Sequence, residues 1–179
     1  MICLLPGKHN PKTGFCKREF FALNFRRGGL GWGMAGPFQH PHRVSYAECT
    51  VGNHVYHARY LDFLEAARGE FLRALGSPVE FWQAQDIIFP VIEARLRYQS
   101  PARYDDLLAI EVWPLLVRGA RVNFGHRIVN QDGRRILEAE TFHACTSAGE
   151  KPRRVPPELE ALLATYLPSD KTVTVPACA

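Results

Sequence analysis

The chain has 179 residues, of which 46% are hydrophobic and 22% are charged, and its formal net charge is +4. This balance predicts one soluble globular domain. No apolar run approaches the roughly 20 residues that a membrane-spanning helix needs. The excess of Lys and Arg lies in residues 1–33, which leaves the rest of the chain close to neutral. A nucleic-acid groove is therefore not predicted.

Cysteine usage and the ends of the chain set further expectations. The five cysteines, at positions 3, 16, 49, 145 and 178, are odd in number and lack metal-ligand spacing. This pattern is typical of reduced thiols, so we predict a cytoplasmic protein with no structural zinc and no cofactor. Residues 1–36 are predicted to be a disordered leader, with a transit peptide or a start at Met34 as alternatives. The folded domain is predicted at 37–167, followed by a loose tail at 168–179.

The first legible elements are a strand and a long helix. Apolar and polar residues alternate over 42–48 (HRVSYAE), which predicts a strand. After a polar turn, apolar residues recur every three or four positions from 55 to 75, between charged residues. This spacing predicts an amphipathic helix, and Gly76 with Pro78 predicts its end.

Four more strands and a short helix complete the pattern. The strands are predicted at residues 87–99, 107–119, 120–130 and 134–148, and the helix at 157–167. Pro114 predicts an edge, a bulge or a break in the strand that contains it. Asp132 and Gly133 predict a two-residue hairpin turn.

One long apolar helix needs a sheet face to cover it. We therefore predict an α+β fold in which a curved antiparallel sheet wraps round one central helix. Such a sheet has exposed edges, and pairing with a second copy would protect them.

Three segments resemble one family in particular. They are residues 42–76 (HRVSYAECTVGNHVYHARYLDFLEAARGEFLRALG), 96–112 (LRYQSPARYDDLLAIEV) and 136–156 (ILEAETFHACTSAGEKPRRVP). In this order they resemble the signatures of the hotdog-fold acyl-CoA thioesterases of the 4-hydroxybenzoyl-CoA thioesterase type, over roughly residues 38–156. The resemblance implies the hotdog fold, a homodimer or homotetramer, and a thioester of coenzyme A or acyl carrier protein as substrate.

The resemblance also maps site residues onto this chain. The family's D-x-D acids fall on Glu48 and Thr50, so the acid next to the thioester is replaced by Thr. The family's His falls on His57, and its Tyr on Tyr46. The helix acid falls on Glu65. Arg68 matches the helix arginine on which enediyne-type thioesterases of the same fold rely.

Thioester hydrolysis needs a polarised carbonyl, an attacking oxygen and a route for protons. Amides at the start of the helix, at Val55, Tyr56 and His57, are predicted to hold the oxyanion. His57 and Glu65 are the candidate bases, while the Thr50 hydroxyl can only position water or substrate.

Other side chains are assigned more weakly. Asn53 is either a helix cap or a ligand contact. Arg118 and Arg121, together with Arg103, are either phosphate ligands or a solvated rim. Aromatic side chains predicted either for an acyl pocket or for the core are Phe63, Phe81 and Trp82. His126 and His143 lie on strand patterns and are interpreted as structural.

The sequence therefore predicts hydrolysis of an acyl-CoA thioester by direct water attack. Hydrolysis of a carrier-protein thioester is one alternative, and a non-catalytic thioester binder is another, because Thr50 replaces the expected Asp. A hotdog hydratase is disfavoured, since the helix entry has no Asp-x4-His dyad.

Overall fold

The computed structural model describes residues 36–168. The Met34 start and nearly all of the predicted leader and of the predicted tail lie outside these residues. In chain order the elements are β1 (Phe38–Arg43), the 3-10 helix η1 (Tyr46–Glu48), α1 (Arg59–Ala74), α2 (Val79–Gln83), β2 (Val91–Tyr98), β3 (Leu107–Arg118), β4 (Arg121–Asn130), β5 (Arg135–Ala144) and α3 (Pro157–Ala164).

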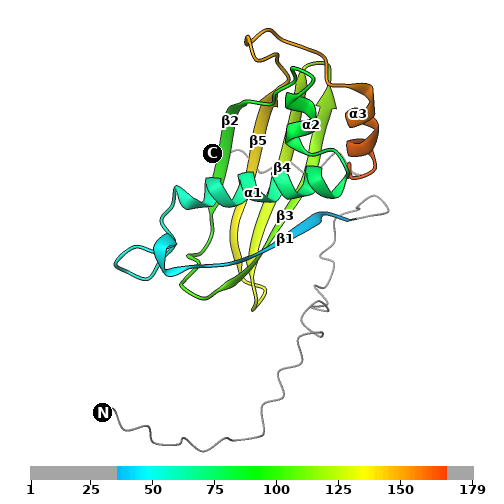
Figure 1. Cartoon of the computed structure of the whole chain (residues 1–179). Helices are drawn as coiled ribbons and strands as arrows, with labels where there is room; N and C mark the ends of the chain where they lie inside the picture. Colours follow the sequence, from blue (N-terminus) through cyan, green and yellow to red (C-terminus); the bar gives the residue numbers. More distant parts are fainter. Residues whose placement is uncertain (1–35, 169–179) are drawn as a thin grey trace, which may run out of the picture.

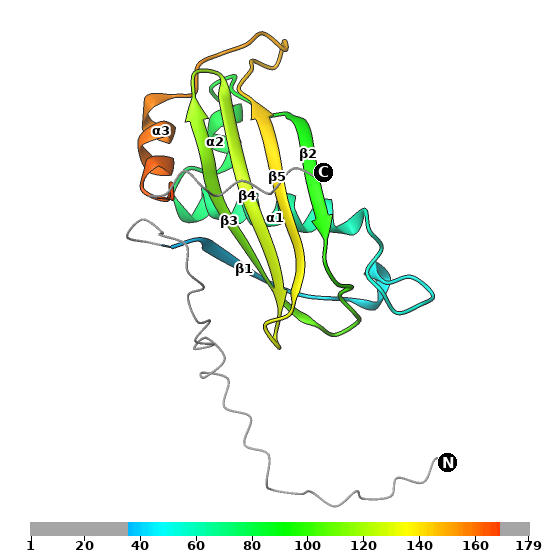
Figure 2. The same cartoon turned by 180° about the vertical axis from the view of Figure 1, so that it is seen from behind.

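The five strands form one antiparallel sheet in the order β1-β3-β4-β5-β2. Helix α1 lies across one face of this sheet, and the view from behind shows the opposite face (Figures 1 and 2). The curved sheet around one long helix confirms the predicted α+β hotdog architecture. Within residues 36–168, no helix combines the length and the apolar character that crossing a membrane requires.

The core lies between α1 and the sheet because both present apolar faces to each other. The buried stripe of α1 includes Phe63, Leu64, Ala67 and Phe71, spaced three or four residues apart. The strands contribute every second residue. The alternating residues of β4 and β5 in the core are Val122, Phe124, Ile128, Leu137 and Ala139, and Ile136, beside a register shift, is buried as well.

The first predicted strand is wrong in position. β1 ends at Arg43, and the residues predicted to continue it form η1. Val44 is buried, but Tyr46 is 81% exposed, so the two do not share a face. The strand prediction was wrong because the apparent alternation spans the change from extended backbone in β1 to a 3-10 helix in η1.

Other differences are local. The long helix begins at Arg59 rather than near Val55, and α2 was not predicted. The β4–β5 hairpin loop has three residues, since Asn130 and Arg134 pair across it and Gly133 has a φ of 74°. A three-residue loop with glycine in the left-handed region is a common hairpin.

Pro114 lies at a bulge in the β3–β4 pairing. A bulge was one of the three alternatives predicted for this proline. Strand β1 pairs with β3 only as far as Val112, so the missing N–H of Pro114 removes no β1–β3 bond.

Candidate active site

The turn between η1 and α1 is held by its own backbone. Cys49 and Val55 form an antiparallel bridge, and the Thr50 N–H donates to the His54 carbonyl at 2.8 Å. The Thr50 hydroxyl donates to the same carbonyl at 3.2 Å. Thr50 therefore acts as a turn residue here, and its hydroxyl proton is already committed.

Asn53 is neither a helix cap nor a residue of the helix. It lies in the left-handed region with a φ of 53°, and its side-chain oxygen accepts the Tyr104 N–H at 3.1 Å. The N-cap position of α1 is Ala58, which has no side-chain cap. Asn53 instead joins the turn to the loop that precedes β3.

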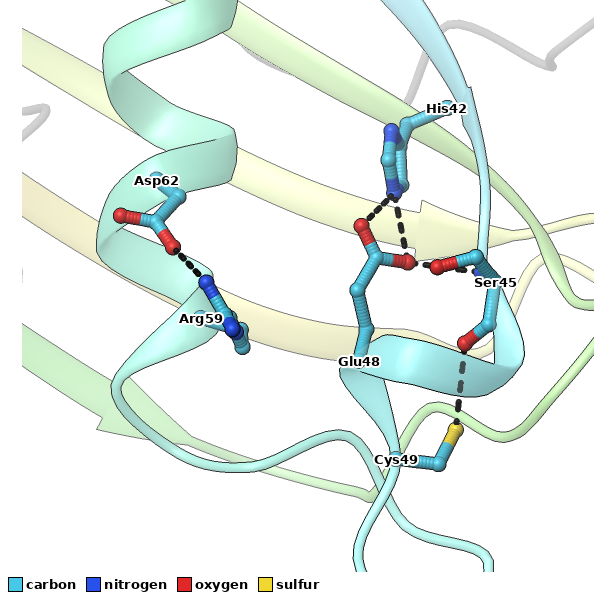
Figure 3. Close-up of polar contacts among 6 residues, drawn as sticks. All are labelled: His42, Ser45, Glu48, Cys49, Arg59 and Asp62. Atoms are coloured by element: carbon cyan, nitrogen blue, oxygen red, sulfur yellow. Dashed lines mark hydrogen bonds and ion pairs between the residues drawn. The ribbon is translucent and has the colours of Figure 1, made fainter.

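Glu48, which stands where the family has its first acid, braces η1. Its carboxylate accepts the Ser45 N–H at 2.7 Å and lies 3.1 Å from His42 Nε2. Figure 3 shows both contacts, with the Arg59–Asp62 ion pair at the start of α1 beside them. Burial raises the pKa of Glu48, but the Ser45 N–H and His42 lower it by more, so the net shift is downward. Glu48 is therefore an ionised structural group.

The predicted oxyanion amides are mostly engaged. The Val55 N–H donates to the Ala102 carbonyl at 2.9 Å, and the Tyr56 N–H donates to the Glu48 carbonyl at 3.0 Å. Of the three, only the His57 amide lacks a backbone acceptor within residues 36–168. The His57 carbonyl accepts a hydrogen bond from the Tyr98 hydroxyl at 3.0 Å. The His57 imidazole packs against the Tyr56 ring in a tilted arrangement.

Glu65 and Arg68 form an ion pair on α1. The Glu65 side chain is 61% exposed, whereas that of Arg68 is only 9% exposed. The pair lines a cavity of about 340 Å³, here called the α1 cavity. Its walls comprise Leu61, Asp62, Leu64, Glu65 and Arg68 from α1, Val91 and Ala94 from β2, His126 from β4, and Thr141 and His143 from β5.

A chain of polar side chains forms the sheet side of this cavity. Arg68 Nη1 lies 3.4 Å from His143 Nδ1. His143 Nε2 and His126 Nε2 each lie 3.0 Å from the Thr141 hydroxyl oxygen. Burial, and after it the Arg68 charge, lower the pKa of His143 to about 4. Burial, and after it His143 and Arg68, lower the pKa of His126 to about 3. Both imidazoles are therefore neutral near pH 7.

The predicted cations do not form one site. Arg118 and Arg121 are exposed and face each other across the β3–β4 hairpin. Arg103 is exposed before the opposite end of β3. Twelve strand residues separate the two ends, a span of roughly 35–40 Å. Arg103 therefore cannot share a phosphate with the other two.

The predicted acyl-pocket aromatics do not line the α1 cavity. Phe63 and Trp82 are buried in the core, and Trp82 donates its indole N–H to the Ser77 hydroxyl at 2.8 Å. Phe81 is 52% exposed. The core alternative is the better description of Phe63 and Trp82.

Comparison with known proteins decides the family. The model of the thioesterase-like superfamily matches residues 44–163. The chain belongs to the thioesterase-like superfamily. This match confirms the predicted family. The predicted enzyme class, a thioester hydrolase, is confirmed by relatives named as acyl-CoA thioester hydrolases.

Individual relatives agree with this assignment. The thioesterase-like chain is 36% identical over 125 residues to the acyl-CoA thioester hydrolase YbgC of Escherichia coli O157:H7, covering 69% of this chain and 93% of the relative. It is 36% identical over 126 residues to the acyl-CoA thioesterase YbgC of Haemophilus influenzae, covering 69% and 92%. A crystal structure of a probable thioesterase from Bartonella henselae covers 67% of this chain and 99% of its own, with 30% identity and a TM-score of 0.63.

Two cavity residues of this thioesterase-like protein, His126 and His143, were interpreted from the sequence as structural. Each lies singly among apolar strand residues, a pattern typical of a core position. The register of β4 against β5 connects them through Thr141, which pairs with Phe124 and whose hydroxyl oxygen lies 3.0 Å from each imidazole. The available signal was that both histidines fall on the helix-facing side of their strands.

Proposed function

We propose that this protein hydrolyses acyl-CoA thioesters in the α1 cavity. The observation that carries the proposal is the Glu65–Arg68 ion pair, which puts an anionic and a cationic side chain on the wall of one cavity. The relatives named as acyl-CoA thioester hydrolases support coenzyme A thioesters as the substrates.

In the proposed reaction, water held by the Glu65 carboxylate attacks the thioester carbonyl carbon, and Glu65 takes the water proton. The Arg68 guanidinium stabilises the negative charge that forms on the carbonyl oxygen, whereas His57 is not among the residues that line the α1 cavity. The C–S bond then breaks, and Glu65 returns the proton to the leaving thiolate. The products are a carboxylic acid and coenzyme A, and Glu65 is ionised again.

The charges and exposure of this pair suit these roles. Glu65 is exposed enough to hold a water molecule, while burial of Arg68 keeps its charge from being fully screened. A guanidinium has five N–H donors, so contacts with Glu65 and His143 leave others for the substrate. The Thr50 hydroxyl already donates to a carbonyl, which assigns it to shaping the turn.

We further propose that the cavity is completed by a second copy of the chain. Val91 and Ala94, which line it, belong to β2, and within residues 36–168 β2 pairs with a strand on one side only, β5. Val91, Ile92 and Tyr98 on this edge strand are each about half exposed or more. An unpaired edge with exposed apolar side chains is suited to pairing between subunits. Tyr46 and Tyr56, which are also exposed, would lie on the rim of the assembled site.

A cytoplasmic location is part of the same proposal. Cys49 and Cys145 are both free, which fits a reducing compartment.

The test is release of coenzyme A thiol, followed with a thiol-trapping reagent across acyl-CoA esters of graded chain length. We expect turnover on at least one ester, and slower turnover on the same acyl group carried by acyl carrier protein. Faster turnover on the carrier-protein ester would favour the carrier-protein alternative. Measurable binding without turnover on any ester would overturn the enzymatic proposal and favour a thioester binder.

A further inference from the structure

The sheet side of the α1 cavity carries polar residues where the fold otherwise places apolar ones. On β4 and β5 the neighbouring helix-facing residues include Phe124, Ile128 and Ala139, all of them core residues. His126, Thr141 and His143 interrupt this apolar surface, and all three are buried. Burying polar groups is unfavourable unless each finds a partner, so the cluster is a candidate ligand-recognition site.

His143 has two neighbours that require opposite proton positions. Its Nδ1 lies 3.2 Å from the Phe89 carbonyl oxygen, which can only accept a hydrogen bond. The same Nδ1 lies 3.4 Å from Arg68 Nη1, which can only donate. A neutral imidazole has one proton, so it satisfies one neighbour at a time.

The position of the proton on His143 fixes the direction of the hydrogen bonds through Thr141 to His126. When His143 Nδ1 carries the proton, Nε2 accepts from the Thr141 hydroxyl, and the hydroxyl oxygen accepts from His126 Nε2. His126 Nδ1 is then an acceptor. In the other arrangement every bond in the chain reverses, and His126 Nδ1 becomes a donor.

The end of the chain is unsatisfied. Within residues 36–168, His126 Nδ1 has no hydrogen-bond partner, although His126 is 1% exposed and lines the cavity. A buried polar atom without a partner calls for an explanation, and an unoccupied ligand position is one. Because of the reversible chain, this atom suits either a donor or an acceptor on the ligand.

The charges of the cavity restrict the ligand further. Its ionised side chains are the Arg68 guanidinium and the carboxylates of Asp62 and Glu65, so carboxylates outnumber cations. Another carboxylate on the ligand would be repelled, whereas a neutral oxygen would not. The remaining walls, with Leu61, Leu64 and Val91, suit hydrocarbon.

We propose that His126, Thr141 and His143 select acyl groups that carry a neutral oxygen substituent, a hydroxyl or an oxo group, over the unsubstituted acyl group. This inference rests on the proposed function, because it concerns the acyl part of the same substrate. The oxygen bonds to His126 Nδ1, and the Thr141 hydroxyl sets whether that atom donates or accepts.

The experiment compares kcat/KM for matched coenzyme A thioesters in the full-length protein. The pairs are butyryl with 3-hydroxybutyryl, butyryl with acetoacetyl, and benzoyl with 4-hydroxybenzoyl, and succinyl is the carboxylate probe. We expect at least one oxygenated ester to exceed its plain partner by about tenfold or more, and succinyl to be poor.

Two variants locate the preference. Thr141→Val removes the hydroxyl at nearly constant volume, and the ratio of oxygenated to plain substrate should fall to about one. Thr141→Ser keeps the hydroxyl and should keep the preference, which separates loss of the hydrogen bond from a packing defect. The far-UV circular dichroism spectrum and the urea unfolding midpoint of each variant report that it has folded.

The outcomes separate the two proposals. If the wild-type protein hydrolyses no ester at all, the proposed function fails. If it hydrolyses plain esters as fast as every oxygenated partner, only the selectivity inference fails. It also fails if the Thr141→Val ratio equals that of the wild type, or if succinyl-CoA is the best substrate.

Discussion

On mild acidification the wild-type protein should lose stability, and replacing both His126 and His143 by Gln should abolish most of that loss. Each imidazole has a reference pKa of 6.5, and burial lowers it in the folded protein to about 3 for His126 and about 4 for His143. Below about pH 6.5 the unfolded chain therefore binds protons that the folded chain does not. The stabilising contribution is present above that pH and is lost as the pH falls toward the folded-state values.

The magnitude follows from these pKa values. Between about pH 7 and about pH 5.5, linkage gives a loss of about 1.2 kcal/mol for each histidine and about 2.5 kcal/mol for the pair. This figure is insensitive to the folded-state pKa values, because both lie well below the pH range used. Glutamine keeps a donor and an acceptor at each position but does not titrate.

The assay is urea unfolding followed by tryptophan fluorescence, at one protein concentration, since assembly would otherwise shift the midpoint. Over this pH range the free energy of unfolding should fall by about 2.5 kcal/mol more in the wild-type protein than in the double variant. The pKa of His40 is also lowered, chiefly by burial, but His40 is present in both proteins and cancels. Equal losses in the two proteins would refute the reasoning about buried neutral histidines.

Three further predictions concern packing, phosphate binding and the turn. Gly125→Ala should cost about 1–3 kcal/mol of stability, because the added Cβ would lie 2.5 Å from the Trp113 ring. Gly69→Ala should stabilise α1, because its Cβ would meet nothing within 4 Å. Equal denaturation midpoints for the two variants would contradict this. Joint replacement of Arg118 and Arg121 by Ala should raise KM for a coenzyme A ester severalfold without changing kcat, and an unchanged KM would assign both to a solvated rim. Thr50→Ala should leave kcat within about threefold of wild type, since its hydroxyl serves a backbone carbonyl; a hundredfold loss of activity would restore it to the catalytic set.

The elements that sequence reasoning placed correctly are those with a sustained local period. The α1 stripe and the alternation along β4 and β5 follow directly from the geometry of helices and strands. The strand predicted at 42–48 was wrong because so few alternating residues do not show where a strand ends, and here β1 ends and η1 begins within them. Helix α2 was missed because five residues give no readable period.

The site was only partly predictable for a different reason. Glu65 and Arg68 lie three positions apart on one helix, so their pairing could be expected from local geometry. The contact between His126, Thr141 and His143 depends on the register of two strands and on α1 above them, which no single window of sequence contains. The separation of Arg103 from Arg118 could have been predicted from the length of the strand between them.

The most direct test of the proposed site compares Glu65→Gln with Glu70→Gln. Both glutamates pair with an arginine three residues later on α1, but only Glu65 lines the α1 cavity, so Glu70 is a matched control. Steady-state release of coenzyme A thiol from the best acyl-CoA ester should fall about 100-fold or more in kcat for Glu65→Gln, and should stay near wild type for Glu70→Gln. Equal activity of the two variants would contradict catalysis by Glu65.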